Sequence, residues 1–322
     1  MTALLAAHAD WSAHPGKRWF ALARRGASGW VGEGPRPVGD PAALTRTLLA
    51  EGGPVAFGLD LPLGVPREWA AGRPEPDFPA FLRGLGAGAP FFAVSPTLDT
   101  VSAERPFYPA RGIRGMTRAA HAAALGLSGP AGLSRLCDRA TAERPAGASL
   151  FWTLGANQVG KAAIAAWRDW LGPALVAGAP LDLWPFAGGY HALLRPGRAA
   201  LAEVYPAEAM RHVGVALRGS KRDRDARRAA VPAIRDAMAR LRVRADATLE
   251  AALRDAFGAD AAGEDRMDCV LGLLGLIGVL DGARPDHVPD DPWILRWEGW
   301  VLGQTAMPRG WKAAGQVEPR LA

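Results

Sequence analysis

Residues 55–66, which read VAFGLDLPLGVP, constrain the fold more than any other part of this chain. The first half is a short apolar run, typical of a strand that is buried on both faces. Asp60 ends that run, and Pro62 and Gly64 prevent the strand from continuing. Open α/β sheets place ligands and metals at the carboxyl ends of such strands. A lone Asp there is more often a turn cap, so a site requires further carboxylates nearby.

The preceding residues predict which strand lies beside this one. Three strands in an antiparallel meander, a helix and the strand just described are expected over residues 4–9, 18–23, 29–33, 41–51 and 55–60. A strand–helix–strand connection is right-handed, which makes the fourth strand parallel to one already in the sheet. We place it beside the first strand. Asp10 and Asp60 should then lie at the same end of adjacent parallel strands.

The rest of the chain predicts an insertion followed by a return to the sheet. Residues 1–60 form the first part of the core, 61–198 a large, mostly helical insertion that roofs the site, and 199–322 the second part with an aromatic tail. A fifth strand is expected at 201–206, with helices over residues 117–125, 161–171, 232–241, 247–257 and 264–280. The prediction is therefore an α/β core of five mixed strands with flanking helices.

Composition limits the setting and the partners. The chain has 322 residues, 49% of them hydrophobic, which allows one large domain or two ordinary ones. Its two cysteines form no disulfide framework, and no secretory signal is apparent, so a cytoplasmic protein is expected. The best apolar run, residues 267–280, is too short to span a membrane. Nothing indicates an obligate protein partner.

The net charge of +6 fits an anionic partner such as a nucleic acid or nucleotide. Residues 217–244 contain ten Lys or Arg against three Asp. Within this basic stretch, Lys221, Arg222 and Arg224 follow the fifth strand closely and are candidates to bind a phosphate backbone. The alternative is an ordinary solvated helix face.

Four carboxylates are candidates for one metal site. Asp10 and Asp60 end their strands, and Asp265 and Asp268 lie three residues apart on one face of the last long helix. Mg²⁺ and Mn²⁺ prefer such oxygen ligands, and two ions about 4 Å apart can clamp a phosphodiester. The alternative is that Asp265 and Asp268 only stabilise the helix N-terminus. In a metal-free cluster, Asp268→Asn should relieve repulsion and leave stability equal or higher.

Glu203 and Lys161 are secondary candidates. Glu203 lies on the fifth strand, where it can either reach the metal site or pair with an arginine. Lys161 ends a segment, residues 155–162, that matches a phosphate-binding loop except at Ala162, which lacks the hydroxyl needed to hold magnesium. A possible strand at residues 149–154 precedes it. The simpler interpretation places Lys161 at a helix N-terminus near the site, where it can contact phosphate. The six histidines show no zinc-ligand spacing.

Six short stretches resemble the ordered motifs of domain-of-unknown-function family 429: ADWS at 9–12, GLDLPLGVP at 58–66, QVGK at 158–161, EVYP at 203–206, DRMDC at 265–269 and EGWVLG at 298–303. The resemblance implies a ribonuclease H-like fold and a nuclease activity. In ribonuclease H-like enzymes, carboxylates at the ends of the first and fourth strands and on the last helix bind the metals. That likeness implies Asp10, Asp60 and Asp268 as the core set, with Asp265 as a fourth. The Asp-x-x-Asp pair also resembles the last helix of Holliday-junction resolvases, which lack the large insertion.

The sequence thus predicts a metal-dependent nuclease that uses Mg²⁺ or Mn²⁺. One alternative is a phosphotransferase or nucleotide hydrolase on the same fold. Another is a non-catalytic protein that binds a nucleotide or nucleic acid. The sequence does not identify the substrate.

Overall fold

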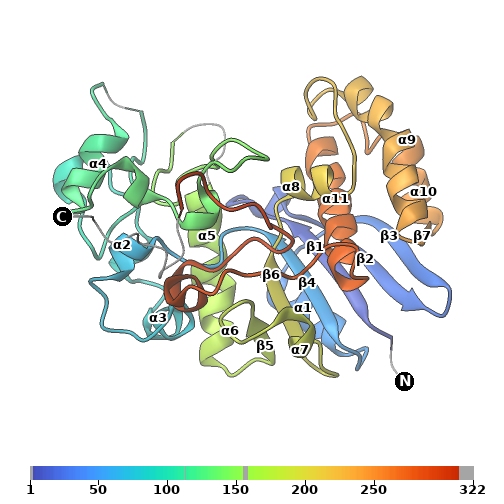
Figure 1. The fold of residues 1–322 in the computed structure, drawn as a ribbon, viewed down its shortest axis with the longest axis horizontal. Coiled ribbons are helices and arrows are strands. Elements are labelled where there is room, and N and C mark those ends of the chain that lie inside the picture. Colours follow the sequence, from blue (N-terminus) through green and yellow to red (C-terminus); the bar gives the residue numbers. More distant parts are fainter. Residues whose placement is uncertain (1–2, 113, 155–158, 312–322) are drawn as a thin grey trace, which may run out of the picture.

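A seven-stranded mixed sheet is the centre of the computed structural model, which describes residues 3–112, 114–154 and 159–311 (Figure 1). The strands lie in the order β5-β6-β4-β1-β2-β3-β7, and only β2 runs antiparallel to its neighbours. Their bounds are β1 Leu5–Asp10, β2 Trp19–Gly26, β3 Gly29–Pro37, β4 Val55–Asp60, β5 Leu181–Leu183, β6 Ala199–Glu203 and β7 Val243–Ala245.

Most of the helices are short. The α-helices are α1 Pro41–Leu49, α2 Arg67–Ala70, α3 Phe78–Gly84, α4 Arg118–Ala124, α5 Val159–Ala166, α6 Gly172–Val176, α7 Tyr190–Leu193, α8 Pro206–His212, α9 Arg224–Arg240, α10 Ala247–Arg254 and α11 Gly263–Leu280. The 3-10 turns are η1 Pro15–Lys17, η2 Pro90–Phe92, η3 Leu98–Thr100, η4 Pro130–Leu133 and η5 Leu136–Asp138, and the π turns are η6 Trp167–Leu171 and η7 Ile294–Glu298. None of the described helices is long and apolar enough to cross a membrane.

The expected pairing of the first and fourth strands is confirmed. β4 has the predicted bounds, and it pairs in parallel with β1 so that Asp10 lies opposite Asp60. α1 begins at Pro41 as expected, because the Asp40 side chain accepts a hydrogen bond from the backbone N–H of Ala42 at 2.9 Å. Local capping and strand signals were therefore sufficient here.

The prediction of five strands is wrong, because β5 and β7 add to the sheet. β5 lies within the segment assigned to the insertion and pairs with β6, and β7 pairs with β3. Three residues are too few to show an alternating pattern, so these strands form only because a neighbouring strand offers hydrogen bonds. The fifth predicted strand is β6, which ends earlier than expected because Pro206 begins α8.

Two further predictions are corrected. Residues 149–154 form no strand; they make turns with one isolated bridge between Trp152 and Tyr108. The helix expected from residue 232 begins at Arg224, where the Asp223 side chain caps the first turn, and Pro232 is accommodated inside it. A proline such as Pro232 favours the first turn of a helix, but the Asp223 side chain caps the helix earlier in the chain; the helix therefore begins at the Asp223 cap and not at the proline.

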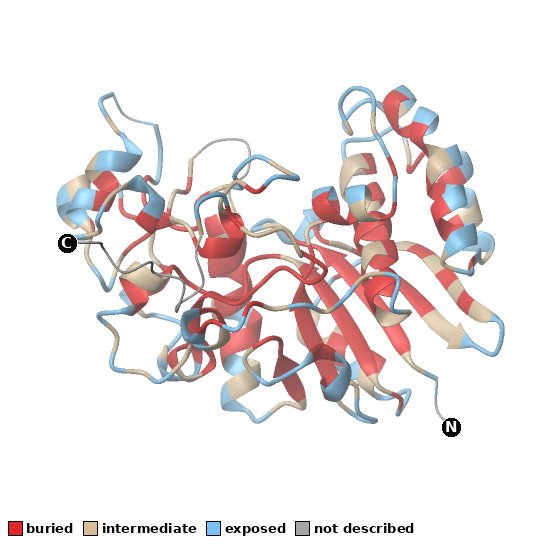
Figure 2. Ribbon diagram, in the orientation of Figure 1, coloured by how far each residue is buried: buried red, intermediate tan, exposed pale blue. Residues whose placement is uncertain are grey.

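The sheet is covered on both faces, which makes three layers (Figure 1). Alternate residues such as Ala7 and Phe57 pack in a hydrophobic cluster with α1 and the insertion helices. Their neighbours Ala6 and Ala56 pack in a second cluster with α8, α9 and α11. β1 and β6 are buried along their whole length and β4 as far as Leu59, whereas α9 and α10 present exposed outer faces (Figure 2).

Candidate carboxylate site

The contact between His8 and Gly272 places α11 against β1. A Cβ atom on Gly272 would lie 2.2 Å from the His8 ring, so only glycine permits this close approach. The His8 side chain is fully buried, and its Nε2 donates to the Val204 carbonyl at 3.1 Å. Burial lowers the pKa of His8 to about 4, so the ring is neutral at physiological pH. His8 therefore locks β1, α11 and the end of β6 together.

This contact brings the predicted carboxylates together. Asp10 is two residues beyond His8 and thus points to the same face of β1, and Asp60 is its partner on β4. Asp268 lies one helical turn before Gly272 on α11. The three carboxylates consequently converge at the C-terminal ends of β1 and β4, and Asp265 adds its charge to Asp10 from one turn further back.

The local electrostatics show that these carboxylates repel one another. Burial, followed by the charges of Asp60, Asp268 and Asp265, raises the pKa of Asp10 well above its usual value. Burial and the charge of Asp268 raise the pKa of Asp60 to about 7, and burial raises the pKa of Asp268 to about 6. The Asp10 and Asp60 side chains share a hydrogen bond, so this pair retains a proton near neutral pH.

Lys221 neutralises part of this cluster. Its Nζ donates to both oxygens of Asp268, at 2.7 and 2.6 Å. Although burial lowers the pKa of Lys221, the charges of Asp268 and Asp60 outweigh it and raise that pKa. This pairing changes the expectation for Asp268→Asn: the substitution removes a partner of a half-buried ammonium as well as a repulsive charge.

The other two basic candidates bind carboxylates elsewhere. Arg222 pairs with Glu264 at 3.3 Å and keeps 80% of its side chain exposed, and Arg224 pairs with Asp255. The buried Arg227 donates to the carbonyls of Lys221 and Arg222 and so holds this loop in place. Part of the basic stretch therefore supports the position of Lys221 rather than presenting free charge.

Glu203 pairs with an arginine, the second of the two alternatives expected for it. Both of its oxygens accept hydrogen bonds from Arg135 at 2.6 Å, and Oε2 also accepts one from the backbone N–H of Leu63 at 2.9 Å. Glu203 and Arg135 are completely buried, and Asp138 neutralises the guanidinium further. Because Leu63 follows Asp60 closely, this ion pair positions the loop that leaves β4.

Glu298 completes the attachment of that loop. A Cβ atom at Gly64 would lie 2.1 Å from the Glu298 carbonyl oxygen, and Gly64 has a φ of +138°. The Glu298 carboxylate in turn accepts hydrogen bonds from Arg67 and from the backbone of Leu136. The roles of Arg135 and Glu298 were not predicted from the sequence, because a buried charge network between distant segments has no local pattern. The stretch that contains Glu298 was singled out only by its resemblance to a family motif.

The phosphate-loop match has a packing explanation. A Cβ atom at Gly160 would lie 2.2 Å from the Leu150 carbonyl oxygen, so glycine is required by the contact with the preceding turn. Lys161 lies half-buried in the first turn of α5. Residues 155–158 of the match lie outside the described residues. Because the described residues 149–154 form no strand, they do not supply the strand that precedes a nucleotide loop.

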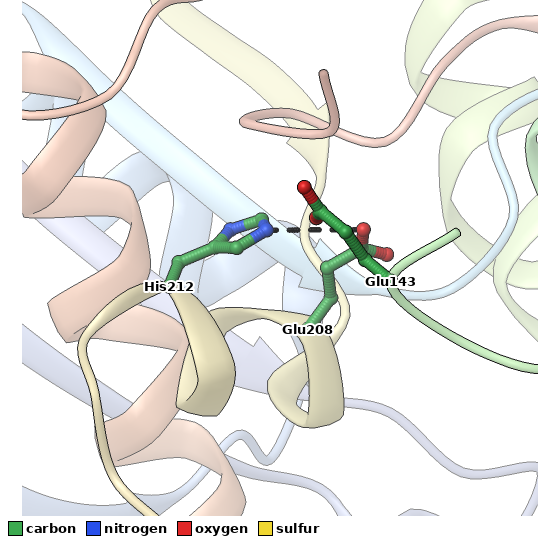
Figure 3. Close-up of side chains that lie close together, drawn as sticks. All are labelled: Glu143, Glu208 and His212. Carbon is green, nitrogen blue, oxygen red and sulfur yellow. Dashed lines mark ion pairs between the residues drawn. The ribbon is translucent and has the colours of Figure 1, made fainter. Parts of the chain in front are cut away.

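Within the described ranges, one group of three side chains has ligand atoms all within 4.8 Å of one another, and it is not the aspartate cluster. It consists of Glu143, Glu208 and His212 (Figure 3). Sequence reasoning found no zinc-ligand spacing among the histidines, yet Glu208 and His212 are four residues apart on α8 and share a helix face. The four-residue spacing of Glu208 and His212 was the one sequence signal for this group, because Glu143 lies in a distant segment and joins them only in the folded protein.

No family model matches this sequence, and comparisons with curated proteins and with solved structures likewise found no match. The likeness to domain-of-unknown-function family 429 therefore stays a prediction.

Proposed function

We propose that the protein hydrolyses phosphodiester bonds with a divalent cation held by Asp10, Asp60, Asp268 and Asp265. The observation that carries this proposal is the Asp10–Asp60 pair, whose carboxyl groups share a hydrogen bond at the ends of adjacent parallel strands, opposite Asp268. A buried and a half-buried carboxyl group in contact are costly unless a proton or a cation lies between them.

The residues fit Mg²⁺ or Mn²⁺ chemically. The donor set consists of carboxylate oxygens, which hard cations prefer, and the pKa values of Asp10 and Asp60 are raised first by burial and then by the charges of neighbouring carboxylates. Asp268 is bound to Lys221, so it joins this set when that ammonium releases it. A bound ion would activate water and stabilise the charge that develops on the phosphate.

The remaining residues hold the site in position and supply charge. Lys221 can exchange Asp268 for a phosphate oxygen, which a point-charge ammonium binds well. His8 sets the separation between β1 and α11, and the Arg135–Glu203 ion pair fixes the loop after Asp60. Such buried supports keep reacting groups within the narrow range of geometries that catalysis needs.

The topology supports a ribonuclease H-like core as the framework of this site. The carboxylates come from the ends of the first and fourth strands and from the last long helix, which is the placement that the family resemblance implies. The order β3-β2-β1-β4-β6 contains the five expected strands, and β5 and β7 extend it at the edges.

Turnover of labelled DNA, RNA and ATP with and without Mn²⁺ tests the proposal. Wild-type protein should cleave a nucleic acid only with metal, and Asp10→Asn and Asp60→Asn should abolish cleavage. Asp236→Asn, an exposed carboxylate on α9, is the control and should remain active. Turnover of ATP alone would instead indicate a nucleotide hydrolase, and metal-dependent binding without turnover would indicate a binding protein.

A further inference from the structure

Two side chains of α8 and one of the insertion meet at a second site (Figure 3). Glu208 and His212 lie on the same face of α8, with His212 Nε2 3.8 Å from Glu208 Oε1. Glu143 comes from the turn region that follows η5 and approaches both of them. The site therefore joins the core of the protein to its insertion.

The facing atoms of Glu208 and His212 are buried and have no hydrogen-bond partner among the described residues. The two side chains are only 3% and 9% exposed. Glu208 Oε2 accepts a hydrogen bond from Arg144 Nε at 3.0 Å, which directs Oε1 toward His212. Leaving a buried polar atom unpaired is costly, and a ligand between these two facing atoms would satisfy both.

The spacing of these atoms suits a metal ion. A separation of 3.8 Å is too long for a hydrogen bond. Two ligands that each lie about 2.0–2.2 Å from one ion are at most about 4.4 Å apart, and the observed value falls within that limit. Both facing atoms would then be satisfied at once.

Two arginines contact the carboxylates of this site. Arg144 binds the outer oxygen of Glu208, and Arg284 lies 3.7 Å from Glu143 Oε2. These arginines offset part of the negative charge, but their contacts leave the inner Glu208 oxygen unpaired.

We propose that Glu143, Glu208 and His212 bind a divalent transition-metal ion of the Zn²⁺ class. An imidazole with two carboxylates suits zinc better than magnesium, and three protein ligands leave a fourth position for water. The ion would hold the insertion against α8.

This site is separate from the aspartate cluster. A Cβ atom at Gly303 would touch both His212 and Val279, each at 3.4 Å, so His212 lies near the C-terminal end of α11. Asp268 lies near the other end of that helix, about 16 Å away along its axis at 1.5 Å per residue. Zinc binding here does not depend on the proposed nuclease activity.

Titration of the full-length, EDTA-stripped protein with Zn²⁺ against a competing chelator dye tests this inference. With excess Mg²⁺ present to occupy the aspartate cluster, wild type should bind one equivalent of Zn²⁺, and Zn²⁺ should raise its melting temperature. His212→Ala and Glu143→Gln should each weaken Zn²⁺ binding by at least about tenfold. Loss of a residue that only supports a metal ligand already costs about that much, so loss of a ligand itself should cost no less. His191→Ala, an exposed histidine outside both proposed sites, should bind as wild type does.

Glu143→Gln keeps the test decisive if the buried His212→Ala fails to fold, because the Glu143 side chain is 47% exposed. Failure of the folded wild type to bind Zn²⁺ would overturn the proposal. Equal Zn²⁺ affinity in wild type and Glu143→Gln, with the same rise in melting temperature, would do so as well. Loss of binding in Asp10→Asn alone would assign the ion to the aspartate cluster instead.

Discussion

Asp60→Asn should make the metal-free protein more stable at pH 8 and leave it little changed near pH 4. The pKa of Asp60 is raised from 3.8 to about 7, mainly by burial and then by the charge of Asp268. Between these values the folded protein holds a proton that the unfolded chain has released. The free energy of unfolding therefore falls as pH rises through this window, and asparagine removes that loss.

The size of the effect follows from the shift. Each pKa unit corresponds to about 1.4 kcal/mol, so about three units give roughly 4 kcal/mol for a carboxyl group shielded from water. Asp60 is half-buried, and solvent screening reduces the expected gain at pH 8 to about 2 kcal/mol. The gain should disappear as the pH falls toward the unfolded-state pKa.

Urea unfolding followed by tryptophan fluorescence at pH 4, 6 and 8 with EDTA measures this difference, with Asp236→Asn as the control. Mn²⁺ at constant ionic strength should then stabilise wild type at pH 8 and stabilise Asp60→Asn much less. If Asp60→Asn loses the same stability at every pH, the residue is a structural cap and the repulsion argument fails. If Mn²⁺ stabilises both proteins equally, the ion does not bind at Asp60.

Three further outcomes are expected. Asp268→Asn should destabilise the metal-free protein by about 1–3 kcal/mol in urea unfolding, because Lys221 loses a charged partner. Lys221→Met should cost a similar amount, and the double variant should lose less than the sum of the two; an additive loss would show that the two residues are not coupled. Arg135→Met should cost about 3–5 kcal/mol in the same assay by leaving Glu203 charged and buried, and Glu203→Gln in that background should restore part of it; an unchanged midpoint would contradict the buried ion pair. If duplex DNA is bound, Arg222→Ala should lower the slope of log affinity against log salt by about 0.9, and an unchanged slope would show that this arginine contacts no phosphate.

Sequence alone was sufficient where neighbouring residues decide the structure. The bounds of β4, the Asp40 cap of α1 and the right-handed crossover all depend on short-range patterns or on chirality. Together they placed Asp10 beside Asp60, and the three-residue spacing put Asp265 and Asp268 on one face of α11.

Tertiary structure alone decided which charges meet. Lys221 binds Asp268 and Glu203 binds Arg135, although other basic residues lie close to each of them in the sequence. The edge strands β5 and β7 likewise form only where a neighbour is present. The physical reason is that a strand period or a helix cap depends on a few adjacent residues, whereas the partner of a buried charge depends on which distant segments the folded core brings into contact.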